Sequence, residues 1–456
     1  MIKPVQTNLN TNSVGILNAI RDNSSLEYYQ AVPRAEQTTE SIQNVGAAIC
    51  AFQPRMNEFI SSLINRIVKV IATSKMYSNP WAFAKKGVLE FGETVEEIFV
   101  NIANAVPFQP ENAYKENFKR TIPDVRSAFH AMDLQTYYPV TISEQQLRQA
   151  FVSMDGVTDL IARIVNSLYS AMNYDEFIMM KYTIAVLAYG GSIATVVQNE
   201  NDTKADVKAI KKVSNAFRFM TTNYNISGVA NFSDVTDQYI ITTADFDADM
   251  DIDVLASAFN LSKAEFMGRR VMVDSFGFND GEIARLKNLL AKDSTVNLTE
   301  LPTISRAMTT VKAVIMDRDF FQIYDNLTQF TENYVGSGLY WNEFLHVWRT
   351  YSASPFANVA MLIPTVPTIT SVNVNGEAAP SAGHMYTYLA NVSATAFANK
   401  GVTWSVSEGT GAAGTVTIDE LGRLHTSEDA VGTWTVKATS VFDSTKSGVK
   451  SITLRK

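Results

Sequence analysis

Five aspartates at every second position are the densest set of side chains in this sequence that could do chemistry. They are Asp245, Asp247, Asp249, Asp251 and Asp253. A calcium loop also alternates acidic residues, but it needs Gly at its sixth position and Glu at its twelfth. A loop counted from Asp245 has Met250 and Ala256 there. The pattern therefore favours an exposed strand edge over a metal site, and the last aspartates are expected to cap a helix over 254–259.

Histidine and cysteine form no recognisable catalytic or metal-binding set. The histidines lie at positions 130, 346, 384 and 425, and none has ligand spacing to another or to Cys50. Cys50 follows a small, apolar stretch and is expected to be an inert buried thiol, and His346 is expected to make a hydrogen bond within a strand. The sequence holds no nucleophile elbow, Walker loop or dinucleotide fingerprint. It therefore predicts a protein that is not an enzyme, with no catalytic residue, cofactor or metal.

Length and composition predict a folded protein of two or more domains. The chain has 456 residues, 46% of them hydrophobic, and its net charge is −8. An acidic chain is a poor nucleic-acid binder, because such binding needs clustered Lys and Arg. The first residues have no apolar signal segment, and no stretch approaches the roughly 20 apolar residues of a membrane span. We expect folding in a reducing cytoplasm, away from membranes.

A charged segment over 85–102 is predicted to be a hairpin within a long, irregular excursion between 79 and 139. Lysines and glutamates are segregated on its two arms: Lys85, Lys86, Glu90, Glu93, Glu96 and Glu97. Such charges usually form a solvated surface. On a projecting loop, however, they could pair between neighbouring subunits and fix their register.

The rest of the body is predicted to be α+β. Residues 1–50 are polar and suit an arm that gains its order from neighbours, and helical spacing follows over 56–71. Ser143 and Gln146 form a capping-box pattern before a helix, and a long strut helix is expected over 157–188. Strands are expected at 311–316 and 320–324 around a turn, and a long strand at 339–348.

The chain changes character at 364–367, where Pro364 and Pro367 precede a segment that is predicted to be all-β. Strands are expected at 402–406 and 433–438, with a corner at 422–424 between them. The last fifth of the chain is therefore expected to be a separate module.

Short phrases along the body resemble, in the same order, the major capsid proteins of tailed phages with the Hong Kong 97-type fold, above all those of phi-twenty-nine-like podophages. The phrases are NAIR at 18–21, FISSL at 59–63, KKG at 85–87, TVEEI at 94–98, DVLA at 253–256, AFN at 258–260, YDNL at 324–327, GLYWN at 338–342 and HVW at 346–348. The module resembles bacterial immunoglobulin-like (Ig-like) group 2 domains through VTWS at 402–405, GRL at 422–424 and TVKA at 435–438.

The resemblance implies four parts. They are an N-terminal arm and helix (1–75), an extended E-loop (76–140), a P-domain with a spine helix together with an A-domain (141–363), and an all-β Ig-like sandwich (364–456). It implies a subunit that self-assembles through hexamers and pentamers into an icosahedral or prolate shell around double-stranded DNA, which it contacts weakly. A scaffolding protein and a portal (connector) would be further partners, and assembly would take place in the host bacterial cytoplasm.

Two other classes remain open on the sequence. A bacterial surface adhesin or glycan-binding protein would also carry an Ig-like module, but it would need a secretion signal. An enzyme with an accessory module would need a catalytic cluster. If the module only decorates the shell, deleting residues 366–456 should leave assembly intact.

Overall fold

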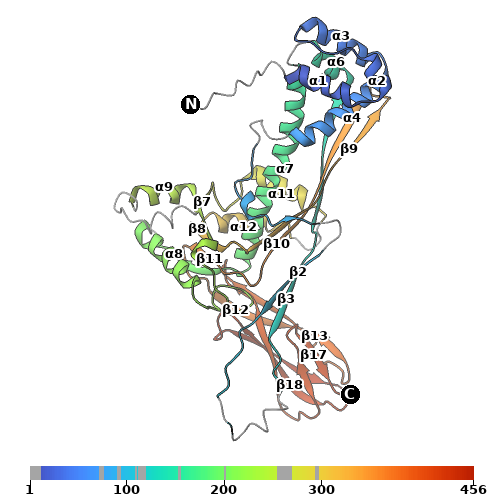
Figure 1. The fold of residues 1–456 in the computed structure, drawn as a ribbon. Coiled ribbons are helices and arrows are strands. Elements are labelled where there is room, and N and C mark those ends of the chain that lie inside the picture. The colour runs from blue at the N-terminus through green and yellow to red at the C-terminus, as the bar shows by residue number, and fades with distance from the viewer. Residues whose placement is uncertain are drawn as a thin grey trace.

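Figure 1 shows a computed structural model with helices at one end, a mixed body in the middle and strands alone at the other end. The structure describes residues 12–70, 77–89, 94–107, 110, 120–152, 156–199, 202–253, 270–292 and 297–455. The predicted helix over 254–259 lies outside the described residues. The α+β class and the all-β character of the last fifth are both confirmed.

The long helix α7 (Gly156–Tyr189) connects the helical end to the middle of the body (Figure 1). Its 34 residues span about 50 Å at 1.5 Å per residue. It stops where Gly191 adopts a left-handed φ of 75°, which residues other than glycine adopt only at a cost. The predicted strut helix and its glycine stop are confirmed, and Gly156 is the first helical residue.

Beside α7 lies a four-stranded sheet in the order β1-β9-β10-β4. Its strands are β1 (Gly87–Val88), β9 (Phe321–Val335), β10 (Tyr340–Ala353) and β4 (Leu134–Ser143). The long strand expected from residue 339 is therefore confirmed as β10. Its residues Trp341, Leu345 and Val347 share one buried face, as alternation along a strand requires.

The predicted hairpin over 85–102 is wrong in its pairing. Strand β1 pairs in parallel with β9, whereas β2 (Val95–Val100) pairs antiparallel with β3 (Val125–His130). The partner of β2 lies about thirty residues downstream, and the sequence pattern of β2 alone cannot specify it. We call the two-stranded unit of β2 and β3 the ribbon.

Five helices form a cap at one end of α7 and the sheet. They are α1 (Asn12–Asn23), α2 (Leu26–Ala31), α3 (Thr39–Cys50), α4 (Gln53–Val70) and α6 (Glu144–Ala150). Helix α4 confirms the helical spacing from residue 56, and the Ser143–Gln146 capping box is formed. The expectation that 1–50 takes its order from neighbours is wrong for 12–50, whose side chains share a core with Trp341 and Leu345 of the same chain.

A five-stranded sheet in the order β5-β11-β8-β6-β7 forms the rest of the body. Its strands are β5 (Ala194–Val197), β11 (Val359–Ile363), β8 (Ala313–Asp317), β6 (Gln238–Thr243) and β7 (Arg270–Val273). One face packs against α8 (Thr203–Phe217) and α9 (Ala244–Asp253). The other packs against α7, α11 (Asp280–Leu289) and α12 (Leu301–Met308). The expected turn between β8 and β9 exists, but it joins two different sheets.

The expectation of a strand edge for the alternating aspartates is wrong, because they lie on helix α9. Phe246 and Met250, four residues apart, are buried against the sheet, and this helical spacing decides the local structure. Asp247 Oδ1 lies 2.8 Å from Arg270 Nη1. In the described part of the chain, no three His, Cys, Asp or Glu side chains are grouped so that they could hold a metal ion.

The C-terminal strands enclose a core of their own, which contains Tyr388, Trp434 and Val436. They pair as β12 with β14, as β13-β17-β16 and as β15-β18-β19. Their bounds are β12 (Ile369–Asn375), β13 (Met385–Thr387), β14 (Leu389–Ala394), β15 (Val402–Glu408), β16 (Val416–Ile418), β17 (Arg423–Thr426), β18 (Gly432–Ser440) and β19 (Ser447–Leu454). The strands expected at 402–406 and 433–438 are confirmed and pair antiparallel with each other.

Candidate intersubunit surfaces

The two lysines predicted to contact neighbouring subunits make ion pairs within their own chain. Lys85 Nζ lies 3.1 Å from Glu176 Oε2 on α7 and 2.5 Å from Asp325 Oδ2 on β9. Lys86 pairs with Asp319. These contacts fix the chain just before the ribbon begins.

Of the four predicted glutamates, Glu90 and Glu93 lie outside the described residues. The Glu97 carboxylate accepts a hydrogen bond of 2.7 Å from Ser354 Oγ and lies 3.1 Å from His130 Nε2. Glu96 is exposed. An intersubunit role for Lys85, Lys86, Glu90, Glu93, Glu96 and Glu97 stays a prediction, and Glu96 is the described member whose side chain faces solvent.

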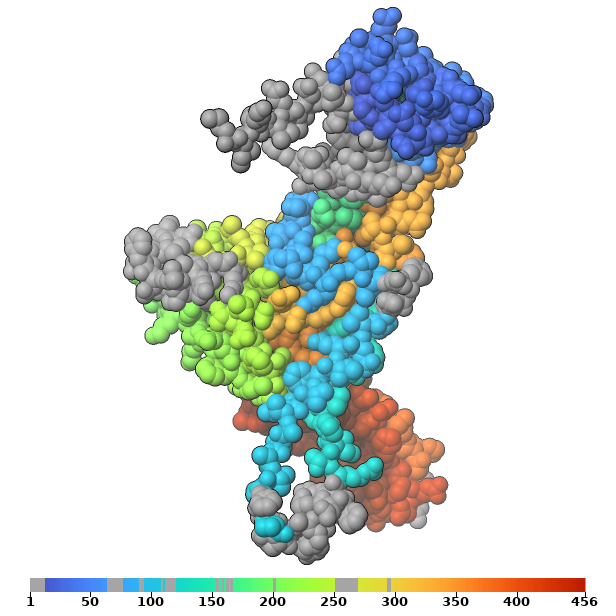
Figure 2. Space-filling view, in the orientation of Figure 1, coloured from blue at the N-terminus to red at the C-terminus, as the bar shows by residue number. Residues whose placement is uncertain are grey.

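The inner face of the ribbon packs on its own subunit. The rings of Phe99 and Phe356 are stacked 5.5 Å apart, and Arg126 donates to the backbone oxygen of Ser227. Asn101 Oδ1 accepts a hydrogen bond from the Ala230 amide. The base of the ribbon is therefore attached to the body, and Figure 2 shows its cyan residues at the surface, running toward the red C-terminal region.

The outer face of the ribbon exposes large apolar side chains. Cross-strand pairing places Ile98 opposite Ser127, Val100 opposite Val125, and Glu96 opposite Phe129. Ile98, Val100, Val125 and Phe129 are each more than half exposed, and Phe129 reaches 67%. A two-stranded ribbon is marginally stable in water by itself, and a contiguous apolar face normally marks a contact surface. The charge pattern predicted a contact in this segment, but the apolar face depends on the register of β2 with β3, which the sequence pattern does not specify.

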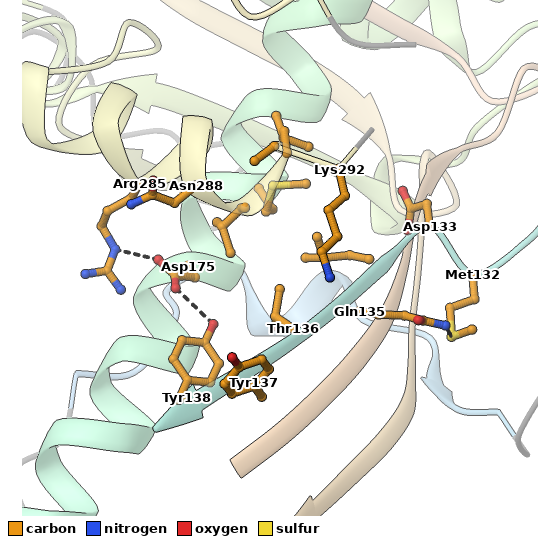
Figure 3. A pocket seen from close by; sticks show the side chains of 15 residues that line it. Met132, Asp133, Gln135, Thr136, Tyr137, Tyr138, Asp175, Arg285, Asn288 and Lys292 are labelled. Carbon is orange, nitrogen blue, oxygen red and sulfur yellow. Dashed lines mark hydrogen bonds and ion pairs between the residues drawn. The ribbon is translucent and has the colours of Figure 1, made fainter. Parts of the chain in front are cut away.

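A groove of about 840 Å³ lies between β4, α7 and α11 (Figure 3). Asp175 on α7 accepts hydrogen bonds from Tyr138 Oη at 2.9 Å and Arg285 Nε at 2.6 Å. Burial and the Asp175 carboxylate raise the pKa of Tyr138, so its hydroxyl stays a donor. Lys292 extends over β4 from the opposite wall (Figure 3).

The groove follows an edge strand of the sheet, since β4 pairs only with β10 among the described strands. Pro139, which lies in β4 just beyond the residues that line the groove, lacks the N–H that an added strand would bond. A partner of this groove is therefore expected to bind through side chains. Arg285 is paired with Asp175, so Lys292 is the basic side chain that gives this wall of the groove a positive charge.

The hydrogen bond predicted for His346 is formed, whereas Cys50, predicted to be buried, is only partly so. His346 Nε2 lies 2.9 Å from Thr331 Oγ1 across the β9–β10 pair, which confirms the expected hydrogen bond. Cys50 is partly buried beside the core of the cap, and burial raises the pKa of its thiol, which lowers its reactivity.

The arrangement of spine helix, four-stranded sheet, projecting ribbon and five-stranded α+β region is the Hong Kong 97-type capsid fold. The structure is similar to one described as "Capsid structure of Staphylococcus phage Andhra", with a TM-score of 0.50 and 15% sequence identity. The similarity covers 64% of this chain and 86% of that one. It shows the fold.

This chain belongs to the Phi29-like phage major capsid protein family, whose profile matches residues 17–363. It is 34% identical over 447 residues to the major capsid protein of Bacillus phage B103, covering 95% of this chain and 92% of that protein. It is 33% identical over 445 residues to the major capsid protein of Bacillus phage PZA, with the same coverage. The chain is thus a phage major capsid protein, a structural protein that associates with itself to form the virion shell, and the adhesin alternative has no support.

None of the helices in the described part of the chain has the length and hydropathy that a bilayer span requires.

Proposed function

We propose that copies of this chain hold the shell together by placing the outer face of one ribbon in the β4–α11 groove of a neighbouring copy. The proposal rests on the exposed apolar face of the ribbon, whose two strands would be only marginally stable by themselves. This face is formed by Ile98, Val100, Val125 and Phe129. Burying it against a second copy would stabilise both the ribbon and the contact.

Charge complementarity supports this partner. Glu96 lies on the same outer face as Phe129, and Lys292 lines the groove. An acid on one copy facing Lys292 on the next would set the register of the contact and disfavour wrong alignments. Each contact is small, but repetition around hexamers and pentamers multiplies its effect on the shell.

Replacing Phe129 by serine should lower the yield of closed shells by roughly tenfold or more, because every subunit loses the same apolar contact. The unassembled variant should stay folded, since Phe129 is mostly exposed. Sedimentation and negative-stain microscopy would measure shell yield. Leu421→Ser, an exposed apolar residue of the C-terminal region, is the matched control.

Charge reversal tests the proposed position of the ribbon. Glu96→Lys should impair assembly by placing a positive charge against Lys292, and adding Lys292→Glu should restore it. If the double variant assembles no better than Glu96→Lys alone, the ribbon binds elsewhere. If Phe129→Ser assembles as well as Leu421→Ser does, its outer face is not the contact.

The same proposal includes the finer features of a phage head. The shell would be icosahedral or prolate, built in the host bacterial cytoplasm with a scaffolding protein and completed by a portal. The net charge of −8 on each chain suits a shell wall that contacts double-stranded DNA weakly, so that packed DNA can leave. The subunit would act without catalysis or a cofactor, because its function depends on contacts between copies.

The C-terminal region would be the Ig-like group 2 domain that its VTWS, GRL and TVKA phrases resemble. Its three small sheets around one core, with β15 paired to β18, support this assignment. Displayed on the outer surface of the head, it could hold weakly to host or environmental glycans.

A further inference from the structure

One loop of the C-terminal region leaves its own core and enters the core of the body. Residues 395–401 join β14 to β15, and Phe397 within this loop is only 6% exposed. Phe397 belongs to the core cluster that contains Ile184 and Ala188 of α7 and Ile193. The next residue, Ala398, belongs instead to the core around Trp434. We call residues 396–400 the plug.

The backbone of the plug is held in an unfavourable conformation. Phe397 has a φ of 70°, in the left-handed region that side chains with a Cβ rarely adopt. Such a conformation persists only when the surrounding packing requires it. Here the packing is the insertion of the Phe397 ring among side chains of the body, so the contact between the two parts is specific.

The body makes room for the plug at the end of α7. A Cβ atom on Gly191 would lie 2.2 Å from the backbone nitrogen of Asn399 and 2.4 Å from the carbonyl carbon of Ala398. No side chain fits at that approach, so glycine is required for space as well as for its φ of 75°. Lys400 Nζ lies 5.6 Å from the centre of the Tyr189 ring, within cation–π range.

We infer that the C-terminal region is a clamp on the spine helix: the plug completes the body's core and holds the C-terminal end of α7 and the start of β5 in place. A decorating module would need only a tether at 364–367. This region instead supplies a buried aromatic ring to the body, across a backbone approach that a single methyl group would prevent. Because α7 connects the plug to the cap, the clamp would stiffen the subunit along its length.

Replacing Gly191 by alanine tests the clamp from the side of the body, without changing the C-terminal region. The added methyl group should displace the plug and expose the end of α7. Backbone hydrogen exchange over 187–197 in the unassembled full-length chain should then become at least about tenfold faster. Amides of β18 should keep their protection, which would show that the C-terminal region itself stays folded.

Gly228→Ala is the matched control, because Gly228 is also left-handed, at φ 61°, but an added Cβ would meet no atom within 4 Å. It places a methyl group on another left-handed glycine, away from the plug and without the collision. Equal exchange rates over 187–197 in the two variants would mean that the collision with the plug does not loosen this segment, and would overturn the clamp.

Phe397→Ala provides an independent measurement if Gly191→Ala fails to fold. It removes the inserted ring and should speed exchange over 187–197 while β18 stays protected. Unchanged exchange over 187–197 in Phe397→Ala would also overturn the inference. The outcome is separable from the ribbon contact, since both measurements use unassembled protein.

Discussion

Replacing Glu343 by glutamine is expected to stabilise the protein at pH 8 by about 3–5 kcal/mol and to leave its stability at pH 4 nearly unchanged. Glu343 lies on β10 with 0% exposure, on the same face as Trp341 and Leu345. Neither of its carboxylate oxygens has a hydrogen-bond partner among the residues that the structure describes. Burial, and then the Glu332 carboxylate opposite it on β9, raise its pKa from 4.5 to about 8.

The direction of the pH effect follows from which state binds the proton more tightly. Below pH 4.5 Glu343 is protonated in the folded and unfolded chains alike, so it has no ionisation effect on stability. As the pH rises toward 8, the unfolded chain releases the proton and the folded chain keeps it. The protein should therefore lose about 1.4 kcal/mol per pH unit from this group over that range.

Urea unfolding of the unassembled chain between pH 4 and 8.5 would measure this effect. The stability curve of Glu343→Gln should be flatter than that of the natural chain, with the two converging at low pH. The exposed Glu420→Gln is the matched control and should shift stability by less than about 0.5 kcal/mol. A stabilisation of Glu343→Gln that is the same at pH 4 and pH 8 would contradict the ionisation argument.

Replacing Arg349 by methionine is expected to destabilise the protein by about 3–5 kcal/mol, because it leaves buried carboxylates without their main partner. Arg349 is 4% exposed, lies where Asn326 of β9 interrupts the pairing register with β10, and contacts Glu176 at 2.8 Å and Asp325 at 2.7 Å. Lys85 contacts the same two acids. The four residues form one network that connects β9, β10, α7 and the chain just before the ribbon.

A double variant separates the loss of the pair from the loss of packing. Arg349→Met with Asp325→Asn should cost less than the sum of the single variants, since no charge on Asp325 is then left unpaired. Arg148→Met is the matched control. Its pair with Glu144 is an i,i+4 contact on the surface, with Arg148 54% exposed, and should be worth less than about 1 kcal/mol. Denaturant midpoints of the four variants would measure these losses of stability. If the loss in the double variant equals the sum of the losses in Arg349→Met and Asp325→Asn, these residues do not act as a network.

The sequence predicts an independent C-terminal module, whereas the inferred clamp makes this region part of the body. The sequence predicts that deleting residues 366–456 leaves assembly intact, because a segment with its own strands and turns is expected to fold independently of the body. Phe397 contradicts that independence in the structure, since its ring is part of the body's core. A single buried aromatic residue in a loop has no periodic pattern that could reveal where it inserts.

Much of the local structure could be predicted from the sequence, and the ordered phrases indicated the family. The Ser143 capping box, the spacing of α7 up to Gly191 and the alternation of β10 are all encoded within a few residues of one another, so each was predictable. The alternating aspartates were misassigned because a period of two in the polar residues hid the helical spacing of Phe246 and Met250.

Contacts between residues far apart in the sequence depend on the packing of the whole chain. Lys85 and Glu176 are 91 positions apart, and Phe397 lies more than two hundred positions after the start of β5, which its plug helps to hold. The pairing of β2 with β3, the burial of Glu343 and the approach of Gly191 to Asn399 also depend on register and packing between separate segments. A local pattern sets the conformation of a segment, but the burial of apolar surface across the whole chain selects its partner.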